Sequence, residues 1–212
     1  MFELLSFVAG PVQTNCYVLC SGKRAVVIDP GDRGKELYTR IVSRGLTVDA
    51  ILLTHGHFDH IGGVNELKEL SGAPVYVSEN DAEMLHDGKK NFSVYFGMAI
   101  DSVSFDHTVK DGDVLTFGEI TLKVLETPGH SKGSVVYRTE DCLFTGDTLF
   151  QASAGRTDGY GGSERELLAS LRRLYDLPGD YKVYPGHGES TTLQIERETN
   201  EYMGICHDES DF

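Results

Sequence analysis

Residues 54–60, Thr-His-Gly-His-Phe-Asp-His, place three histidines and one aspartate within six consecutive positions. The apolar residues 50–53 before this stretch favour a strand, and residues 61–68 after it begin a helical pattern. A loop between a strand and a helix is well suited to carry metal ligands, because both ends of the loop are fixed in position. The stretch therefore predicts a metal site, and the alternative is a solvated polar loop.

The spacing within the stretch indicates how its side chains are divided. His55 and His57 are two residues apart, so in an extended segment both imidazoles leave the same side. Asp59 and His60 come at the turn into the helix, where they can face a second, neighbouring position.

Three more residues with metal-binding side chains follow predicted strands. His130 lies in TPGHS, Asp147 in TGDT and His187 in PGHG, each directly after a glycine. A glycine lets the backbone turn sharply and approach a neighbour closely. One such turn would fit a purely structural role, but three of them beside the first cluster predict that these side chains converge on it. We expect the other histidines (His86, His107 and His207) to be surface residues.

Composition limits the class of protein. The chain has 212 residues and a formal net charge of −14, and 40% of its residues are hydrophobic. We expect one domain over residues 1–212. An acidic chain disfavours nucleic-acid partners, which need Lys and Arg contacts, and anionic membrane surfaces. The first residues lack the basic and apolar regions of a signal peptide, so we expect a cytoplasmic protein with reduced cysteines. The oligomeric state is left open.

The pattern of apolar residues predicts strands in two clusters with helices between them. Helices are expected at 33–44, 61–71, 80–86, 163–176 and 191–203, and strands at 2–8, 15–20, 24–29, 49–53, 74–77, 114–117, 120–125, 134–138, 142–145 and 181–184. This arrangement suggests an α/β (α+β) protein in which two packed sheets carry helices on their outer faces.

Residues 87–101 break the pattern, with two glycines, two lysines and three aromatic residues but no clear period. A loop of this length inside a compact domain is often functional, so it could act as a lid over the site. A packed connector whose aromatic residues belong to the core is an equal alternative.

The motifs THGHFDH, TPGHSKGS, FTGDTLF, GRTD and YPGHGES occur in this order along nearly the whole chain. In this it resembles the metallo-β-lactamase fold hydrolases, and within them the glyoxalase II-like (hydroxyacylglutathione hydrolase-like) branch. The C-terminal helical domain of full glyoxalase II enzymes is missing, so the resemblance is to a short form. It implies a four-layer αββα sandwich with a metal site at one edge, between the two sheets.

The resemblance also implies two divalent metal ions and their ligands. One ion would be held by His55, His57 and His130, the second by Asp59, His60 and His187, and Asp147 would bridge the two. Imidazole and carboxylate ligands suit Zn²⁺, our first choice, as well as Fe or Mn.

The implied chemistry is hydrolysis of a small-molecule thioester or related carbonyl ester. Two nearby cations lower the pKa of a bridging water, and the resulting hydroxide attacks the carbonyl carbon. Asp59 would act as the catalytic residue by ligating one ion and orienting the hydroxide.

Substrate contacts are less defined. Arg156 corresponds to a basic glutathione contact of the family, but Asp158 stands where a tyrosine is expected, so Arg156 could instead pair with that acid. Lys132, close to His130 in sequence, is a second candidate for meeting an anionic substrate, and a solvated lysine is the alternative.

Two other functions remain open at this stage. Mononuclear iron persulfide dioxygenases share the ligand pattern and the GRTD segment, although GDTLF fits the hydrolases better. A non-catalytic metal-binding module is also possible, but structural sites are usually closed by four protein ligands. A nuclease is disfavoured by the charge, and a true β-lactamase by Asp147, where those enzymes more often carry cysteine, and by the lack of an export signal.

Overall fold

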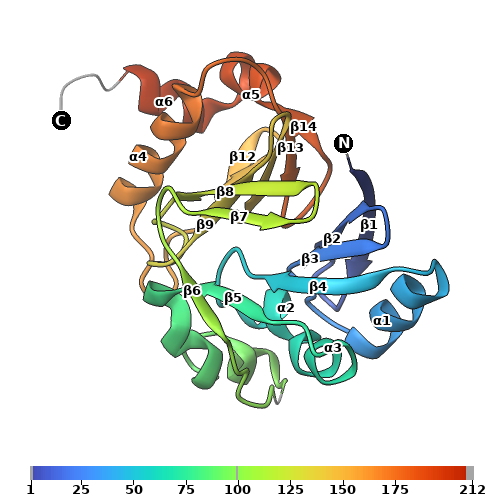
Figure 1. Ribbon diagram of the computed structural model, residues 1–212. Coiled ribbons are helices and arrows are strands. Elements are labelled where there is room, and N and C mark those ends of the chain that lie inside the picture. The colour runs from blue at the N-terminus through green and yellow to red at the C-terminus, as the bar shows by residue number, and fades with distance from the viewer. Residues whose placement is uncertain (1, 99, 209–212) are drawn as a thin grey trace.

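The computed structural model describes residues 2–98 and 100–208, with the backbone alone for 206–208. Two six-stranded sheets lie face to face, and helices cover the outer face of each (Figure 1). This is the predicted αββα sandwich.

The first sheet has the order β1-β2-β3-β4-β5-β6. Its first three strands are antiparallel neighbours, and β3 to β6 run parallel. The strands are β1 (Glu3–Ala9), β2 (Thr14–Ser21), β3 (Arg24–Ile28), β4 (Thr47–Leu52), β5 (Val75–Ser78) and β6 (His107–Val109).

The second sheet has the order β14-β13-β10-β9-β8-β7, in which only β10 and β13 are parallel neighbours. Its strands are β7 (Val114–Phe117), β8 (Ile120–Glu126), β9 (Val135–Arg138), β10 (Cys142–Gly146), β13 (Lys182–Pro185) and β14 (Thr191–Thr192). A small separate hairpin pairs β11 (Leu149–Phe150) with β12 (Ser153–Ala154).

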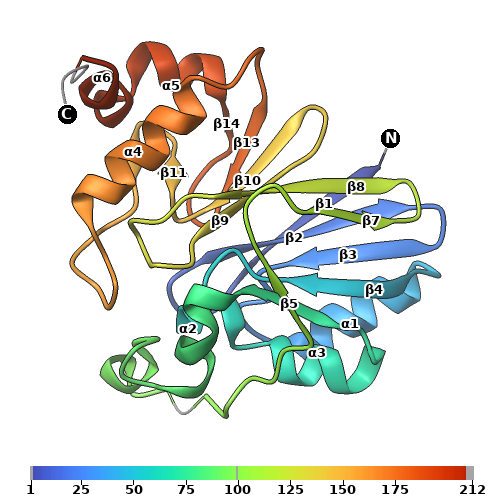
Figure 2. The ribbon, with the colours of Figure 1, turned by 60° about the vertical axis from the view of Figure 1, so that its left-hand side comes forward.

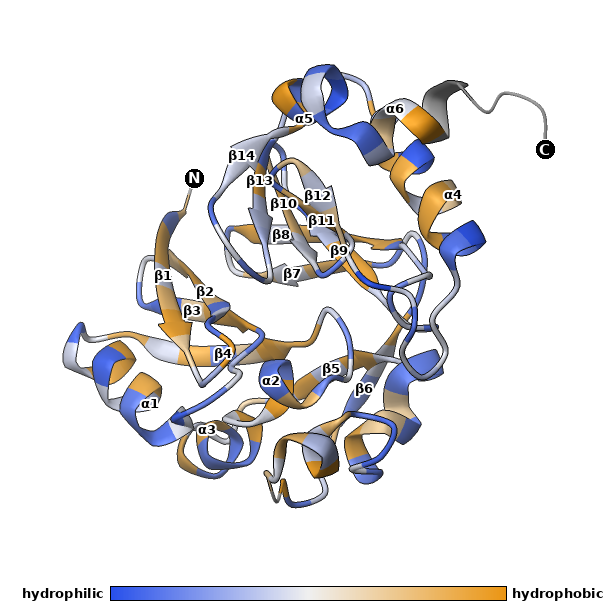
Figure 3. Cartoon of the chain, turned by 180° about the vertical axis from the view of Figure 1, so that it is seen from behind, coloured by the Kyte–Doolittle hydropathy of each residue, from blue (hydrophilic) through white to orange (hydrophobic). Residues whose placement is uncertain are grey.

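The helices form the two outer layers (Figure 2). On the first sheet lie α1 (Gly34–Ser43), α2 (Phe58–Ile61) and α3 (Val64–Ser71), and on the second α4 (Glu164–Tyr175), α5 (Leu193–Thr199) and α6 (Glu201–Asp208). Figure 3 shows these helices banded in hydrophilic and hydrophobic residues, as expected when one face covers a sheet. None of the described helices is both long and apolar enough to cross a bilayer.

Three apolar clusters hold the four layers together. One lies between the first sheet and its helices, one between the two sheets, and one between the second sheet and α4 to α6. Cys16 and Cys20 are buried in the first of these as free cysteines.

Two predicted helices are each divided in the structure. Of the segment 61–71, Ile61 ends α2 and residues 64–71 form α3, because the backbone of Gly63 donates a hydrogen bond to Pro30 O (2.7 Å) instead of continuing a helix. The segment 191–203 becomes β14, α5 and α6, with a break at Asn200. Residues 79–86 form a 3-10 helix, η1 (Glu79–His86), close to the predicted range.

Residues 87–98 are not a connector whose aromatic residues all belong to the core. They contain a second 3-10 turn, η2 (Ser93–Phe96). Asn91 O accepts a hydrogen bond from Phe58 N (2.9 Å), and the ring of Phe92 lies 4.8 Å from that of His57. Tyr95 and Phe96 are exposed. The segment therefore forms a wall beside the His57 loop.

Candidate metal centre

The seven predicted ligand residues lie together at one edge of the sandwich. They come from the loops that follow β4, β8, β10 and β13 and from the short helix α2. Their ligand atoms fall into three overlapping groups, within each of which all atoms lie within 4.8 Å of one another. We call His55, His57 and His130 the histidine group and Asp59, His60 and His187 the mixed group, and the third consists of His55, His60 and Asp147.

Asp147 lies between the histidine group and the mixed group. Its Oδ1 is 3.3 Å from His60 Nε2, and its Oδ2 is 3.5 Å from the Nε2 atoms of both His130 and His187. One carboxylate thus contacts imidazoles of both groups, which is the arrangement that a bridging ligand requires.

Four buried polar atoms of this cluster have no hydrogen-bond partner among the described residues: the Nε2 atoms of His55, His57 and His60, and Oδ1 of Asp147. Buried polar atoms without partners are costly and rare in native proteins. Imidazole nitrogens and carboxylate oxygens at these distances are good ligands for divalent metals. The residues present therefore fit a metal centre.

In three histidines of the cluster, the ring nitrogen Nδ1 is held by a hydrogen bond. His60 Nδ1 donates to Asp29 Oδ2 (2.8 Å), and His130 Nδ1 donates to the carbonyl oxygen of Arg156 (2.8 Å). Thr54 Oγ1 donates to Asp29 Oδ2 (2.6 Å), so its oxygen can accept from His55 Nδ1 at 3.1 Å. The bonds of His60 and His55 place the hydrogen on Nδ1 and leave the lone pair of Nε2 for an ion. In the histidine group, Nε2 of His130 lies 2.8 Å from Nδ1 of His57, so these two nitrogens face each other.

Sequence reasoning missed the residues that orient these ligands. Asp29 was assigned only to a strand, although it too ends a strand before Pro30-Gly31, a signal that could have identified it. Thr14 Oγ1 donates to Asp59 Oδ2 (2.7 Å), and no sequence pattern pointed to it. Asp81 also contacts the ligand loops, through Gly56 N and Ser131 Oγ.

A glycine precedes each of the ligands His130, Asp147 and His187. A side chain at any of these three glycines would collide with neighbouring protein atoms, so the glycines are needed for packing as well as for the approach to an ion. A Cβ at position 186 would lie 2.2 Å from Asp147 Oδ1 and 2.7 Å from His60 Cε1. Glycine there allows the chain before His187 to pass directly behind the cluster.

The ligand side chains of the cluster differ in their tendency to carry charge. Burial and the neighbouring imidazoles lower the pKa of His57 to about 3, and the same causes hold the pKa of His55 well below its usual value. Burial would lower the pKa of His187, but hydrogen bonds to Asp147 and Asp59 raise it to about 9. Burial would likewise raise the pKa of Asp147, but the imidazoles of His60 and His187 hold it well below the usual range. The carboxylate is therefore ionised, ready to act as a ligand.

The two candidate substrate contacts lie beside the histidine group. Arg156 pairs with Asp158 through two hydrogen bonds (2.6 and 2.8 Å), the internal ion pair that the sequence allowed. Lys132 is exposed, with Nζ 5.5 Å from the ring centre of Tyr160. Of the two, Lys132 is the one without an acidic partner within ion-pair distance among the described residues.

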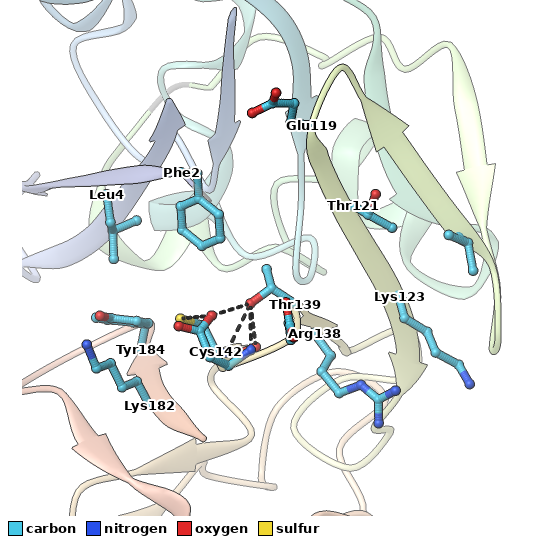
Figure 4. A pocket seen from close by; sticks show the side chains of 13 residues that line it. Phe2, Leu4, Glu119, Thr121, Lys123, Arg138, Thr139, Cys142, Lys182 and Tyr184 are labelled. Carbon is cyan, nitrogen blue, oxygen red and sulfur yellow. Dashed lines mark hydrogen bonds between the residues drawn. The ribbon is translucent and has the colours of Figure 1, made fainter. Parts of the chain in front are cut away.

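A cavity of about 1030 Å³ lies elsewhere, around the turn between β9 and β10 (Figure 4). It is lined by Cys142 and Lys182, which begin β10 and β13, whereas Asp147 and His187 follow the ends of the same strands. The cavity and the metal centre are therefore at opposite edges of the sandwich. His86 and His107 are exposed, as predicted, and the side chain of His207 lies outside the described residues.

Comparison with known proteins agrees with this geometry. A profile of the Metallo-beta-lactamase superfamily matches residues 9–187. The chain belongs to this superfamily. It is 39% identical over 198 residues to Probable metallo-hydrolase YqgX of Bacillus subtilis, covering 92% of this chain and 94% of the relative. It is also 32% identical over 197 residues to Hydroxyacylglutathione hydrolase GloC of Haemophilus influenzae, with coverage of 90% and 93%.

Solved structures show the same fold. BLEG-1 B3 metallo-β-lactamase has a TM-score of 0.90 at 41% identity, covering 95% of this chain and 99% of that one. TTHA1623 in a di-iron-bound form has a TM-score of 0.85 at 38% identity, with coverage of 93% and 99%. ETHE1 from Myxococcus xanthus has a TM-score of 0.76 at 28% identity, with coverage of 100% and 92%. The family supports a metal-dependent hydrolase with a small-molecule substrate.

Proposed function

We propose that this protein is a dinuclear metallohydrolase that cleaves a thioester or related carbonyl ester, in the manner of the hydroxyacylglutathione hydrolases. The observation that carries the proposal is the position of Asp147. Its two oxygens face imidazoles of both the histidine group and the mixed group, which supports a centre of two neighbouring ions that share this carboxylate.

Each group would hold one ion, and Asp147 would be shared. When bound, the ions supply Lewis-acid chemistry that activates a water molecule and polarises a carbonyl oxygen. Zn²⁺ is our first choice, and the similarity to TTHA1623 in its di-iron-bound form keeps iron as an alternative.

The chain's own residues set the geometry and the proton positions. Thr14 fixes one oxygen of Asp59 by a hydrogen bond of 2.7 Å. The other oxygen would orient the attacking water, which is the catalytic role proposed for Asp59. His187 is partly exposed at the edge of the cluster, so a small substrate can reach the centre from solvent.

Lys132 is the proposed contact for an anionic part of the substrate. Replacing it with Gln should raise KM for S-lactoylglutathione several-fold and leave KM for a neutral thioester unchanged, because only the former loses a charge contact. Lys182→Gln, at the opposite edge, is the matched control and should change neither value.

The test of the reaction is a substrate screen with zinc-loaded and iron-loaded protein. The panel contains S-lactoylglutathione, simple thioesters, phosphodiesters, glutathione persulfide and a β-lactam, the last because BLEG-1 is similar over the whole chain. We expect thioesters to be cleaved fastest. Thioesters left intact while another class turns over would refute the proposal.

A persulfide dioxygenase is the second candidate, favoured by the similarity to ETHE1 over the full chain. It predicts a single iron and oxygen consumption with persulfide. A protein that binds metal but turns over none of these compounds would instead be a non-catalytic metal-binding module.

A further inference from the structure

Asp81, in η1, lies between the two loops that carry the histidine group. Its Oδ2 accepts hydrogen bonds from Gly56 N (3.0 Å) and Ser131 Oγ (2.6 Å), and its Oδ1 accepts one from Gly133 N (2.7 Å). Gly56 separates His55 from His57, and Ser131 follows His130 directly. A single buried carboxylate thus joins two loops that are far apart along the chain. Their histidines His57 and His130 are separated by 73 residues.

The packing around Asp81 leaves little room for either loop to shift. A Cβ at position 133 would lie 2.7 Å from Asp81 Cγ, and one at position 56 would lie 2.8 Å from Met84 Cβ. Both loops therefore contact η1 through their backbones. Because glycine occupies these two positions, the carboxylate reaches both amide hydrogens directly.

The chemistry of the three contacts calls for a carboxylate. Both amides are donors, and they bind different oxygens of Asp81. An ionised carboxylate offers two acceptor oxygens, whereas an asparagine side chain offers one oxygen and one donor group. Hydrogen bonds to a charged acceptor are also shorter and stronger than those to a neutral one.

We propose that Asp81 is a positioning residue that sets the spacing of His55 and His57 relative to His130, and thereby the metal affinity of the histidine group alone. The mixed group does not depend on it, since His60 is held by Asp29 and Asp59 by Thr14. The inference rests on the proposed dinuclear centre but not on the proposed substrate.

The experiment compares Zn²⁺ binding by metal-free wild-type protein and Asp81→Asn, by titration in competition with a chelating dye that resolves two binding steps. We expect one step to weaken by about tenfold or more, the range seen when groups behind a metal ligand are removed. The other step should keep its wild-type affinity. Co²⁺ titration followed by visible absorption provides a second readout, in which the spectrum of one of the two sites should change.

Glu196→Gln is the matched control. Glu196 is also a buried carboxylate, and it accepts hydrogen bonds from Ala152 N (2.8 Å), Thr191 Oγ1 (2.7 Å) and Asn200 Nδ2 (2.8 Å). The chemical change and the number of partners are the same, but no partner adjoins a histidine. This variant should lose stability and keep both zinc affinities.

Ser131→Ala removes one of the three donors and keeps the carboxylate, so it should weaken the same binding step by a smaller factor. This milder variant keeps the test decisive if Asp81→Asn does not fold. The inference is overturned if Ser131→Ala and every folded Asp81 variant bind two zinc ions with wild-type affinity. It is also overturned if both binding steps weaken equally in these variants, or if Glu196→Gln weakens one step as much as Asp81→Asn does. Since binding is measured, a wild type inactive on thioesters would refute only the proposed function.

Discussion

Replacing Asp29 with Asn should impair metal binding far more than it impairs folding. Asp29 has a left-handed backbone (φ 51°), a conformation that asparagine tolerates well, so the exchange changes hydrogen bonding and not the chain path. Its Oδ1 accepts from Thr54 N (2.8 Å), and its Oδ2 accepts from Thr54 Oγ1 (2.6 Å) and His60 Nδ1 (2.8 Å).

An amide nitrogen in place of Oδ2 donates where the carboxylate accepted. His60 must then accept at Nδ1 and carry its hydrogen on Nε2, the atom that would bind the ion. The hydroxyl of Thr54 reverses too and donates to His55 Nδ1, with the same consequence for that ring. Two ligand lone pairs are therefore lost by one substitution.

The hydrogen bonds are reversed but not removed, so the metal-free protein should lose only about 1 kcal/mol of unfolding free energy. Zinc affinity should fall about 10–100-fold, the usual effect of changing a group that orients a metal ligand. Asp29→Ala leaves two buried donors, Thr54 N and His60 Nδ1, without a partner and should cost roughly 3 kcal/mol or more.

Urea denaturation of metal-free protein and calorimetric titration with Zn²⁺ measure the two effects. Asp106→Asn is the control, because Asp106 also accepts from a backbone amide, Val75 N (2.8 Å), but is far more exposed. It should change neither quantity strongly. Wild-type zinc affinity in Asp29→Asn, or a stability loss equal to that of Asp29→Ala, would refute the reasoning.

Three further predictions concern the same cluster. Asp147→Ala should lower the occupancy of both ions together, and elemental analysis that finds one ion at full occupancy would contradict the shared-ligand role. Gly186→Ala should reduce metal content, since its Cβ would lie 2.2 Å from Asp147 Oδ1, whereas Gly204→Ala, with open space around it, should not. In metal-free protein the pKa of His187 is raised from 6.5 to about 9, so its stabilisation is complete below about pH 6.5 and is lost as the pH rises through about 9. The urea midpoint should fall over that interval, and a midpoint that rises would count against these contacts.

The sequence predicted the convergence of the ligands because metal-binding side chains at strand ends are a distinctive pattern. The glycine-preceded positions of His130 and His187 at strand ends predicted that they converge on the first cluster, and the resemblance to a known family implied which ion each would hold. Strand β7 (Val114–Phe117) has the predicted bounds, and the turn at Gly118-Glu119 after it marks its end.

The residues that support the cluster could not be predicted in the same way. Asp81 contacts Gly56 and Gly133 across 25 and 52 positions, and hydrogen bonds over such separations leave no local pattern. The division of the predicted helix 61–71 has a similar cause. It depends on the loop around Gly31, whose oxygen would lie 2.4 Å from a Cβ at position 62.

We propose an arrangement in which seven side chains bind two ions with one carboxylate, that of Asp147, between them. Metal analysis of protein purified without added metal tests it most directly. We predict close to two ions per chain. A single ion, or none, at full protein purity would contradict the dinuclear centre.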